Sequence, residues 1–390
     1  MTGSVPRTTV LVFHLGGAGG PAHSLLPEAE ELARTGRLET FVPEPGWVAD
    51  RFGRLGPVTI GRYGALTYAR RPRDLALLVR RLAAETRGFR TAFRDRRPDL
   101  VMVATTTMPA ALVAARLERI PTLVYAAEIH GDGWKASRAR RLWAAALLRA
   151  TAAVADGIVC CSHAVAQQFP VAEPHRIAVA YPAIRDEVAG GDRERGRRRL
   201  GLEGAGPCLV VVGAISRGRG QDVALRALAL VRSRHPAARL AIAGAPHPRA
   251  VDRAYASELR RLAVELGVAD ATVFAGELDE TADLYAAADV VINPARLEEA
   301  FGRVAPEALL AGVPVVATRV GALPEVIRDG VTGLLVPPDD PEALAAAVTR
   351  LYGDAALRER IVAAGREDVC ARFTVEASRA AFSRVIAAIR

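Results

Sequence analysis

The feature that most constrains the fold is the alternation of short, continuously apolar runs with longer stretches rich in Ala, Leu and Arg. The apolar runs are apolar at every position rather than at every second one. Strands of that kind are typical of a parallel sheet that helices cover on both faces. The predicted strands cover 9–15, 58–60, 100–104, 122–126, 157–161 and 177–180 in the first half, and 208–212, 239–243, 272–274, 290–293, 315–317 and 333–336 in the second.

A domain boundary is indicated between these two sets of strands. The segment 185–206 is rich in Arg, Asp, Glu and Gly and contains no strand pattern. We therefore predict an α/β fold with a Rossmann-like domain over 1–184, a linker over 185–206 and a second Rossmann-like domain over 207–373. The C-terminal helix, 374–390, is expected to pack back onto the first domain. Doubly wound domains bind ligands outside the carboxyl ends of their strands, here in a cleft between the two.

Composition argues against several classes of protein. No apolar run reaches the ~20 residues of a membrane span, since Arg149 and Asp156 interrupt the longest one, and the first apolar run, 10–15, is far too short for a secretion signal. The four cysteines have no metal-ligand or redox spacing and are expected to be buried thiols in a reducing compartment. The sequence therefore predicts a cytoplasmic protein without a metal centre.

The charge of the chain, +9, is distributed unevenly. Residues 1–183 carry 24 Lys plus Arg against 15 Asp plus Glu, whereas residues 184–390 carry 28 against 28. The densest basic part is 62–97, with eleven arginines around an apolar stripe at helical spacing formed by Leu75, Leu78, Val79 and Leu82. We expect the stripe to face the core, as it does in helices that cover a sheet. The alternatives are peripheral contact with the anionic inner face of a membrane, or an anionic soluble acceptor held by these arginines. No nucleic-acid partner is predicted.

The most informative part of the sequence lies between residues 293 and 338. Glu299 and Glu307 are separated by seven residues there, with Phe301 and Gly302 between them. A predicted strand, 290–293, precedes the pair, and a predicted helix, 306–311, follows. Residues 301–304 thus form a turn before a helix start, where backbone N–H groups without a helical partner suit a diphosphate.

This stretch resembles the E-x7-E signature of the retaining glycosyltransferases of family 4, which have the GT-B fold. The residues in step with the family's usual run are Glu299, Phe301, Gly302, Glu307, Ala308, Gly312, Pro314, Val315, Val316, Ala317, Gly321, Glu325, Gly330, Gly333, Leu335 and Val336. The resemblance implies that Glu307 accepts hydrogen bonds from the donor ribose and that Glu299 holds hydroxyls of the transferred sugar. It also implies that the amides of Phe301, Gly302, Arg303 and Val304 contact the diphosphate and the sugar.

A second stretch resembles the family's G-R-x4-K-G loop, whose two cations neutralise the leaving diphosphate. Arg219 stands where the family has Lys, and it can bind phosphate through two hydrogen bonds. Ala214 replaces the family's Arg, so Arg217 or Arg303 is expected to supply the second cation. Gly244 and Phe274 are similar to the family's glycine loop and base-edging segment, although Phe274 is more readily explained as a core residue.

The first half holds weaker candidates. By the resemblance, Gly16 and Gly17 face the donor phosphates and the acceptor, while a dinucleotide fingerprint beginning at Gly17 is the competing interpretation. The family often has a sugar-contacting His where this chain has Ala127. His130, three residues later, either reaches the same space or is a structural or solvated histidine.

The resemblance implies a retaining hexosyltransferase that uses a nucleotide diphosphate sugar, with UDP the first choice. The catalytic candidates are Glu299, Arg219 and His130. No cofactor is expected, and because the chain has no D-x-D pair the diphosphate site is expected to work without a metal. The acceptor is left open among natural products, saccharides and lipid-linked molecules. The alternatives are a nucleotide-sugar epimerase of the same fold, a nicotinamide dehydrogenase and a non-catalytic nucleotide-sugar-binding protein.

Overall fold

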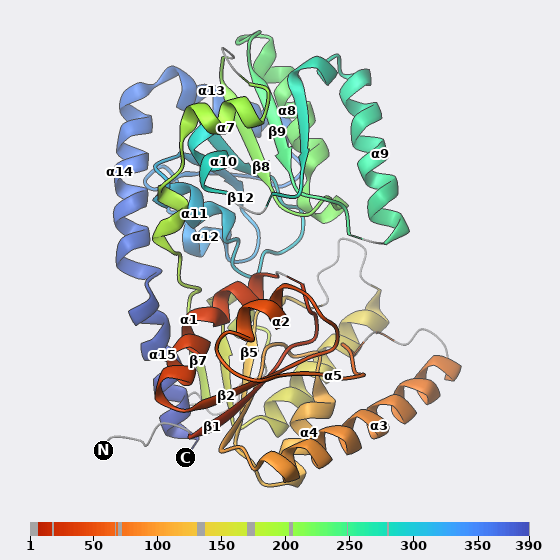
Figure 1. Ribbon diagram of the computed structural model, residues 1–390. Coiled ribbons are helices and arrows are strands. Elements are labelled where there is room, and N and C mark those ends of the chain that lie inside the picture. Colours follow the sequence, from red (N-terminus) through yellow and green to blue (C-terminus); the bar gives the residue numbers. More distant parts are fainter. Residues whose placement is uncertain are drawn as a thin grey trace. The chain divides into compact units, whose positions relative to one another are not determined.

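The computed structural model describes residues 7–17, 19–66, 68, 72–130, 137–169, 176–202, 206–247, 249–278 and 281–389. The chain divides into two compact units (Figure 1). Unit 1 consists of Met1–Ala183 together with Val375–Arg390, and unit 2 consists of Ile184–Thr374. Each unit is built around its own parallel sheet.

Unit 1 contains a seven-stranded sheet with the order β3-β2-β1-β4-β5-β6-β7, in which all neighbouring strands are parallel. Its strands are β1 (Thr8–Val12), β2 (Arg37–Val42), β3 (Val58–Ile60), β4 (Leu100–Val103), β5 (Thr122–Ala126), β6 (Gly157–Cys160) and β7 (Ile177–Val179). Its helices are α1 (Gly20–Thr35), α2 (Trp47–Phe52), α3 (Pro72–Arg96), α4 (Pro109–Leu117), α5 (Arg138–Val154), α6 (His163–Ala166) and α15 (Val375–Ala388). The strand order reverses between β1 and β4, which makes this the switch point of the sheet.

Unit 2 contains a six-stranded parallel sheet with the order β10-β9-β8-β11-β12-β13. Its strands are β8 (Cys208–Val212), β9 (Arg239–Ala243), β10 (Thr272–Gly276), β11 (Val290–Asn293), β12 (Val315–Thr318) and β13 (Leu334–Val336). Its helices are α7 (Arg193–Arg199), α8 (Gln221–Arg232), α9 (Ala250–Glu265), α10 (Ala282–Ala287), α11 (Val304–Leu310), α12 (Leu323–Val326), α13 (Pro341–Gly353) and α14 (Ala355–Arg372), with short 3-10 turns at η2 (Asp186–Ala189), η3 (Arg217–Arg219) and η4 (Ala269–Ala271). The switch point lies between β8 and β11.

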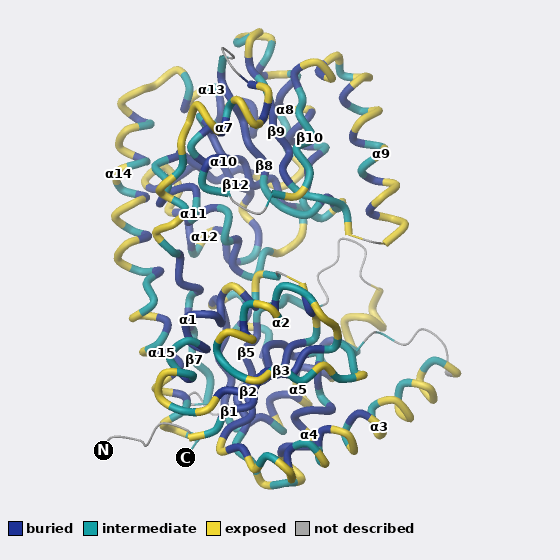
Figure 2. Tube along the Cα trace, viewed as in Figure 1, coloured by how far each residue is buried: buried dark blue, intermediate teal, exposed yellow. Residues whose placement is uncertain are grey.

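The predicted fold class is confirmed, because both sheets are parallel and doubly wound. The inner strands are buried along most of their length, as their apolar runs indicate (Figure 2). Strand β2 was not predicted, since its sequence, RLETFV, contains polar residues. Glu39 is nevertheless 5% exposed in this strand, because Arg96 of α3 donates to its carboxylate at 2.6 Å and Thr59 of β3 donates at 2.8 Å. A strand that contains such a buried, paired carboxylate has no continuous apolar run, so its sequence does not indicate a strand.

The segment predicted as a linker, 185–206, belongs instead to unit 2. Helix α7 packs against α10, and Gly196 lies so close to it that a Cβ there would be 2.0 Å from the carbonyl oxygen of Asp283. The Arg195 guanidinium donates to the Asp283 carboxylate at 2.6 Å. The charged composition of the segment made it resemble a solvated linker. One of those charges, Arg195, in fact forms the ion pair that holds α7 against α10.

Helix α15 at the end of the chain packs on β6 and β7 of unit 1, where the sequence places it. The rings of Tyr125 and Phe382 stack with their centroids 5.7 Å apart. A Cβ at Gly157 would lie 2.5 Å from Cγ1 of Val385, so glycine is needed at that contact. The last helix therefore closes one face of the first sheet.

Helix α3 departs from expectation in its first half. Leu75 and Val79, both in the stripe expected to face the core, are 54% and 57% exposed, whereas Phe89 and Phe93 in the second half are buried. The helix has 25 residues, a length of about 37 Å, whereas β4, which follows it in the chain, has 4 residues. A helix so much longer than the strands of its unit extends past the sheet. In the described part of the chain, no helix is long and apolar enough to cross a membrane.

The cysteines are free thiols, and the expectation of burial holds for all but one. Burial raises the pKa of Cys160 and of Cys208 to about 12. Cys370 is exposed, because it lies on the solvent side of α14. Sequence patterns do not distinguish that side of α14, whose apolar residues are spread around the helix.

Candidate active site

The carboxyl edge of the second sheet is formed by backbone at three neighbouring strands. Gly213 follows β8, Gly244 follows β9 and Gly276 ends β10, and all three have positive φ angles. A Cβ at Gly244 would lie 2.1 Å from the carbonyl oxygen of Gly213, and the Gly244 N–H donates to the carbonyl of Gly276 at 2.7 Å. Only glycine permits this packing. The edge therefore presents main chain rather than side chains, including at the predicted Gly244.

Arg219 and Glu299 meet at the switch point of this sheet. Arg219 ends the 3-10 turn η3 after β8, Glu299 lies in the loop after β11, and their side chains form an ion pair. Gly220, at φ +68°, brings the two loops together, since a Cβ there would be 2.0 Å from the carbonyl oxygen of Pro294. The Arg219 side chain is 39% exposed and the Glu299 side chain 12%. The predicted cation is thus held within reach of a ligand at the strand ends.

A third loop, after β12, fixes the backbone of Glu299. The N–H of Ala322 donates to the Glu299 carbonyl at 2.8 Å. Gly321 has φ +52°, and a Cβ there would lie 2.3 Å from the same carbonyl oxygen. Glu299 is therefore positioned by elements that follow three different strands, which explains why its side chain has a defined direction despite lying in a loop.

Glu307, in the first turn of α11, is held by two partners. The Tyr285 hydroxyl of α10 donates to Glu307 Oε2 at 2.8 Å, and Arg303 donates to Oε1, with Nη2 at 2.9 Å. Tyr285 is fully buried, and burial together with the nearby Glu307 carboxylate raises its pKa well above its usual value. It therefore remains a neutral hydrogen-bond donor. Sequence reasoning missed Tyr285, whose only signal was its place in a helical stretch before β11.

The two arginines proposed as a second diphosphate cation are placed differently. Arg303 pairs with Glu307 and stays at the site. Arg217 does not, because it forms an ion pair with Glu258 of α9 and lies 5.1 Å from the centroid of the Tyr255 ring. Arg217 is therefore engaged with α9 in this structure, whereas Arg303 lies beside Glu307; which of the two supplies the second cation in place of Ala214 stays a prediction.

The turn at 301–304 is buried at its first two residues and half-buried at the other two. Phe301 is 4% exposed and packs edge-to-face on Phe373 with ring centroids 5.4 Å apart, so its side chain belongs to the core. Gly302 has φ +78°, and a Cβ there would meet Leu323 at 2.6 Å. The helix begins at Val304, two residues before the predicted start at Pro306. Contact of this turn's amides with a diphosphate stays a prediction.

Two further features of unit 2 bear on the predicted site. Phe274 packs against the core of the unit and Arg260 covers its ring at 4.4 Å, which supports its explanation as a core residue. Asn293, at the carboxyl end of β11, is 6% exposed, and its Nδ2 has no hydrogen-bond partner among the described residues. Among all the described residues of both units, no group of three or more His, Cys, Asp or Glu side chains is arranged to hold a metal ion.

The predicted residues of the first half lie in unit 1, at the carboxyl edge of its sheet. Gly16 follows β1 and packs so closely on the next loop that a Cβ would lie 2.6 Å from the Glu44 carbonyl oxygen. The N–H of Val48 donates to the Gly16 carbonyl at 2.9 Å. Gly17 has no atom within 4 Å of the position a Cβ would take. Gly16 therefore has a structural reason to be glycine, whereas Gly17 has open space beside it.

His130 is held in place by hydrogen bonds rather than solvated. Its Nε2 lies 2.6 Å from Oγ1 of Thr106, its backbone N–H donates to Gln168 Oε1 at 2.7 Å, and Gln168 in turn donates to the Glu128 carbonyl at 3.0 Å. Burial and the charge of Arg140 lower the pKa of His130, which favours the neutral imidazole. Ala127 comes directly after β5, so the register difference seen in the sequence is present in the structure. A catalytic role for His130 stays a prediction.

Two family models match the chain and together span most of it. The model described as Glycosyltransferase Family 4 matches residues 18–188, and the one described as Glycosyl transferases group 1 matches residues 192–368. Among solved structures, an Anabaena protein, HepE, crystallised with UDP-glucose, superposes with a TM-score of 0.79 at 20% identity, covering 96% of this chain and 98% of that one. Sucrose-phosphate synthase from Thermosynechococcus elongatus gives 0.77 at 22% identity, covering 97% and 98%. At these identities the likeness concerns the fold.

Curated relatives share higher identity over a shorter length. D-inositol 3-phosphate glycosyltransferase of Acidothermus cellulolyticus is 43% identical over 199 residues, which cover 49% of this chain and 43% of the relative. The protein of the same name from Salinispora arenicola is 38% identical over 212 residues, covering 51% and 47%. The chain thus spans about half the length of the curated relatives it matches.

Proposed function

Because this chain belongs to the group 1 glycosyltransferases of family 4, we propose that it transfers a hexose-type sugar from a nucleotide diphosphate sugar to an acceptor, with retention of configuration. The observation that carries the proposal is the arrangement at the second switch point. Arg219 with Glu299, and Arg303 with Glu307, lie on the family's own motif, at the strand ends where doubly wound sheets bind ligands.

The ion pair between Arg219 and Glu299 suggests how a donor is received. A diphosphate carries more negative charge than a carboxylate and offers Arg219 several oxygens, so it competes for the guanidinium. When Arg219 turns to the diphosphate, the Glu299 carboxylate is released to accept hydrogen bonds from hydroxyls of the sugar. We therefore assign Arg219 to the leaving group and Glu299 to the transferred sugar.

Glu307 is assigned to the ribose. Tyr285 and Arg303 hold its carboxylate in one orientation before any ligand arrives, so little rotamer entropy is lost on binding. A carboxylate has about four acceptor sites, and two partners leave room for the ribose hydroxyls. Arg303 lies beside this carboxylate, where it can also contribute positive charge toward the diphosphate.

The transfer step follows from these assignments. The bond between the anomeric carbon and the leaving phosphate oxygen breaks while the acceptor oxygen bonds to the same face of the sugar. The departing phosphate takes the acceptor proton, so no side-chain nucleophile is needed. Catalysis then consists of positioning and of stabilising the negative charge on the leaving group by Arg219 and the turn amides. A metal or cofactor is not required by this scheme, and that stays a prediction.

UDP is the first nucleotide to test, because the HepE structure contains UDP-glucose. D-inositol 3-phosphate is the first acceptor to test, because the curated relatives are named for it. A cytoplasmic location is part of the proposal. Nucleotide sugars are cytoplasmic donors, and the free thiols of this chain fit a reducing compartment. The acceptor alternatives remain a natural product, a saccharide or a lipid-linked molecule.

The experiment is a thermal-shift screen of UDP, GDP, ADP and NAD, followed by mass spectrometry of products made with the matching sugar donors. A shift with one nucleotide and an acceptor-dependent product would support the proposal. Donor conversion without any acceptor would indicate the epimerase alternative, and a shift without turnover would indicate a binding protein. A shift with NAD but not with nucleoside diphosphates would refute the donor assignment.

A further inference from the structure

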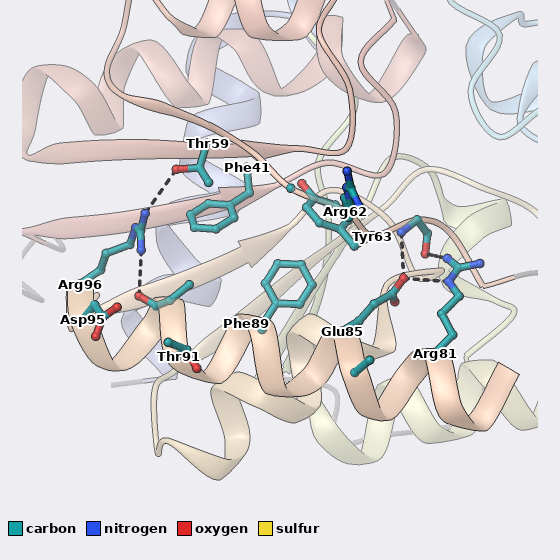
Figure 3. Close-up of a pocket in the computed structure, with 15 residues that line it drawn as sticks. Phe41, Thr59, Arg62, Tyr63, Arg81, Glu85, Phe89, Thr91, Asp95 and Arg96 are labelled. Carbon is teal, nitrogen blue, oxygen red and sulfur yellow. Dashed lines mark hydrogen bonds and ion pairs between the residues drawn. The ribbon is translucent and has the colours of Figure 1, made fainter. Parts of the chain in front are cut away.

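Unit 1 contains a cavity of about 840 Å³ that the donor site does not use. It lies between the edge of the sheet at β2 and β3, the chain that follows β3, and the second half of α3 (Figure 3). Its volume is in the range of pockets that bind small organic ligands. The side chains of Phe41, Tyr63 and Phe89 form an aromatic wall, with the Tyr63 and Phe89 ring centroids 4.9 Å apart.

The charged groups of this cavity are already neutralised. Arg81 pairs with Glu85 at 2.7 Å, and Arg96 pairs with Glu39 at 2.6 Å. Of the other charged lining residues in the described chain, Arg62 and Asp95 have no ion pair and carry opposite signs. A phosphate or carboxylate would therefore find no surplus of positive charge here, and the lining favours a neutral occupant.

Two residues that line the cavity have polar groups with unused hydrogen-bonding capacity. The Tyr63 hydroxyl is buried and has no hydrogen-bond partner among the described residues. Glu85 is 9% exposed, and the bonds from the Gly64 N–H at 3.2 Å and from Arg81 both reach its Oε1, which leaves Oε2 as an acceptor. A buried unpaired donor is costly unless a ligand satisfies it. Aromatic walls with a few polar groups suit a ring system that carries hydroxyl groups.

The wall of the cavity leads to the carboxyl edge of the first sheet. Tyr63 and Gly64 line the cavity, and two residues later the N–H of Leu66 donates to the Thr107 carbonyl at 2.7 Å. The neighbouring Thr106 is the residue that bonds His130. A molecule bound in the cavity therefore lies beside the segment 63–66. That segment is hydrogen-bonded to Thr107, next to the Thr106 that bonds His130.

We propose that this cavity binds the body of the acceptor, and that the acceptor is a neutral, ring-containing molecule with hydroxyl groups. This inference rests on the proposed function and narrows its acceptor class. It disfavours a phosphorylated polyol as the occupant of the cavity, although the curated relatives are named for one. The fit of a hydroxylated ring to Tyr63 and Glu85 would orient one hydroxyl for transfer.

Gly88 allows the cavity to be filled without disturbing the fold. It lies on α3 and lines the cavity, and no atom is within 4 Å of the position its Cβ would take. Gly88→Leu should therefore occupy the space without a clash and should raise helix propensity. Ala83→Leu introduces the same side chain on the same helix, at an exposed position outside the cavity, and is the matched control.

The probe is 4-methylumbelliferone, a fluorescent phenol that is neutral in mildly acidic buffer, with 1-naphthoate as an anionic counterpart of similar size. Saturable binding of the phenol to the full chain is expected, at least tenfold weaker in Gly88→Leu and unchanged in Ala83→Leu. Tyr63→Phe should weaken it about tenfold, the effect of one lost hydrogen bond. No saturable binding, equal binding by Gly88→Leu, or tighter binding of 1-naphthoate would overturn the proposal.

Two further readouts separate this inference from the donor assignment. The thermal shift with the nucleotide that the screen identifies should be the same in the parent and in Gly88→Leu, and the absence of a shift with any of the three nucleotides in both would refute the proposed function rather than the cavity. With the matching sugar donor present, the parent should form a phenol glycoside and Gly88→Leu should not. A parent that binds the phenol and glycosylates other acceptors, but never this class, would overturn the acceptor role.

Discussion

Glu28 in α1 makes the stability of unit 1 depend on pH. This carboxyl group is 5% exposed, and its Oε2 has no hydrogen-bond partner among the described residues. Burial raises its pKa from 4.5 to about 7, with a further increase from the charge of Glu31 and an opposing effect of Arg379 on α15. The folded state therefore binds a proton at pH values where the unfolded state has released it.

The sign and the magnitude follow from that difference. Between pH 4.5 and pH 7 the native state holds more protons than the unfolded state, so the free energy of unfolding falls as the pH rises. A pKa difference of about 2.5 units corresponds to about 3 kcal/mol, at 1.36 kcal/mol per unit. Glu28→Gln cannot ionise, so its stability relative to the parent should increase by about that amount from pH 5 to pH 8.

Differential scanning calorimetry of the parent and Glu28→Gln from pH 5 to pH 8 tests this reasoning. For a unit of this size the change amounts to roughly 6–12 °C in Tm. Glu376→Gln makes the same chemical replacement at an exposed position on α15 and should follow the parent. If the Tm values of the parent and Glu28→Gln keep a constant difference across this range, Glu28 does not retain its proton in the folded state.

The remaining predictions concern the proposed reaction. Glu307→Ala should weaken UDP binding by ~1.5–3 kcal/mol, the contribution of a hydrogen bond to a charged acceptor, as measured by titration calorimetry. Glu299→Ala should mainly lower kcat. If both variants behave like the parent, the donor is placed wrongly. Arg219→Ala should slow transfer by ~10²-fold or more. EDTA should leave most activity intact, and complete loss that magnesium or manganese restores would contradict the metal-free scheme. If the acceptor is lipid-linked, co-sedimentation with anionic vesicles should fall steeply between low and physiological salt, while none at low salt would indicate a soluble acceptor.

The sequence predicted the elements whose signals are local. Continuously apolar strands were found because they are buried on both faces, and Glu299 and Glu307 were found because the family's motif is contiguous. Strand β2 was missed because the partner that permits its buried Glu39, Arg96, lies far along the chain. No window of sequence shows that such a pair will form.

The same limit applies within the site. Tyr285 lies 22 residues before Glu307 and reaches it only because α10 and α11 pack close together. Arg217 is close to Arg219 in the sequence, yet Glu258 on α9 draws its side chain elsewhere. Spacing identifies the residues of a motif, whereas the direction of each side chain depends on partners that tertiary packing supplies.

The placement of α15 has a consequence for biosynthesis. The first sheet is covered in part by a helix, α15, that the ribosome makes only after all of unit 2. At typical rates of bacterial and eukaryotic synthesis, unit 1 waits roughly 10–40 s for α15 while unit 2 is synthesised. During that interval the surface around Tyr125 and Gly157 lacks its cover, so a nascent chain stalled before residue 375 would expose apolar surface that chaperones and proteases recognise.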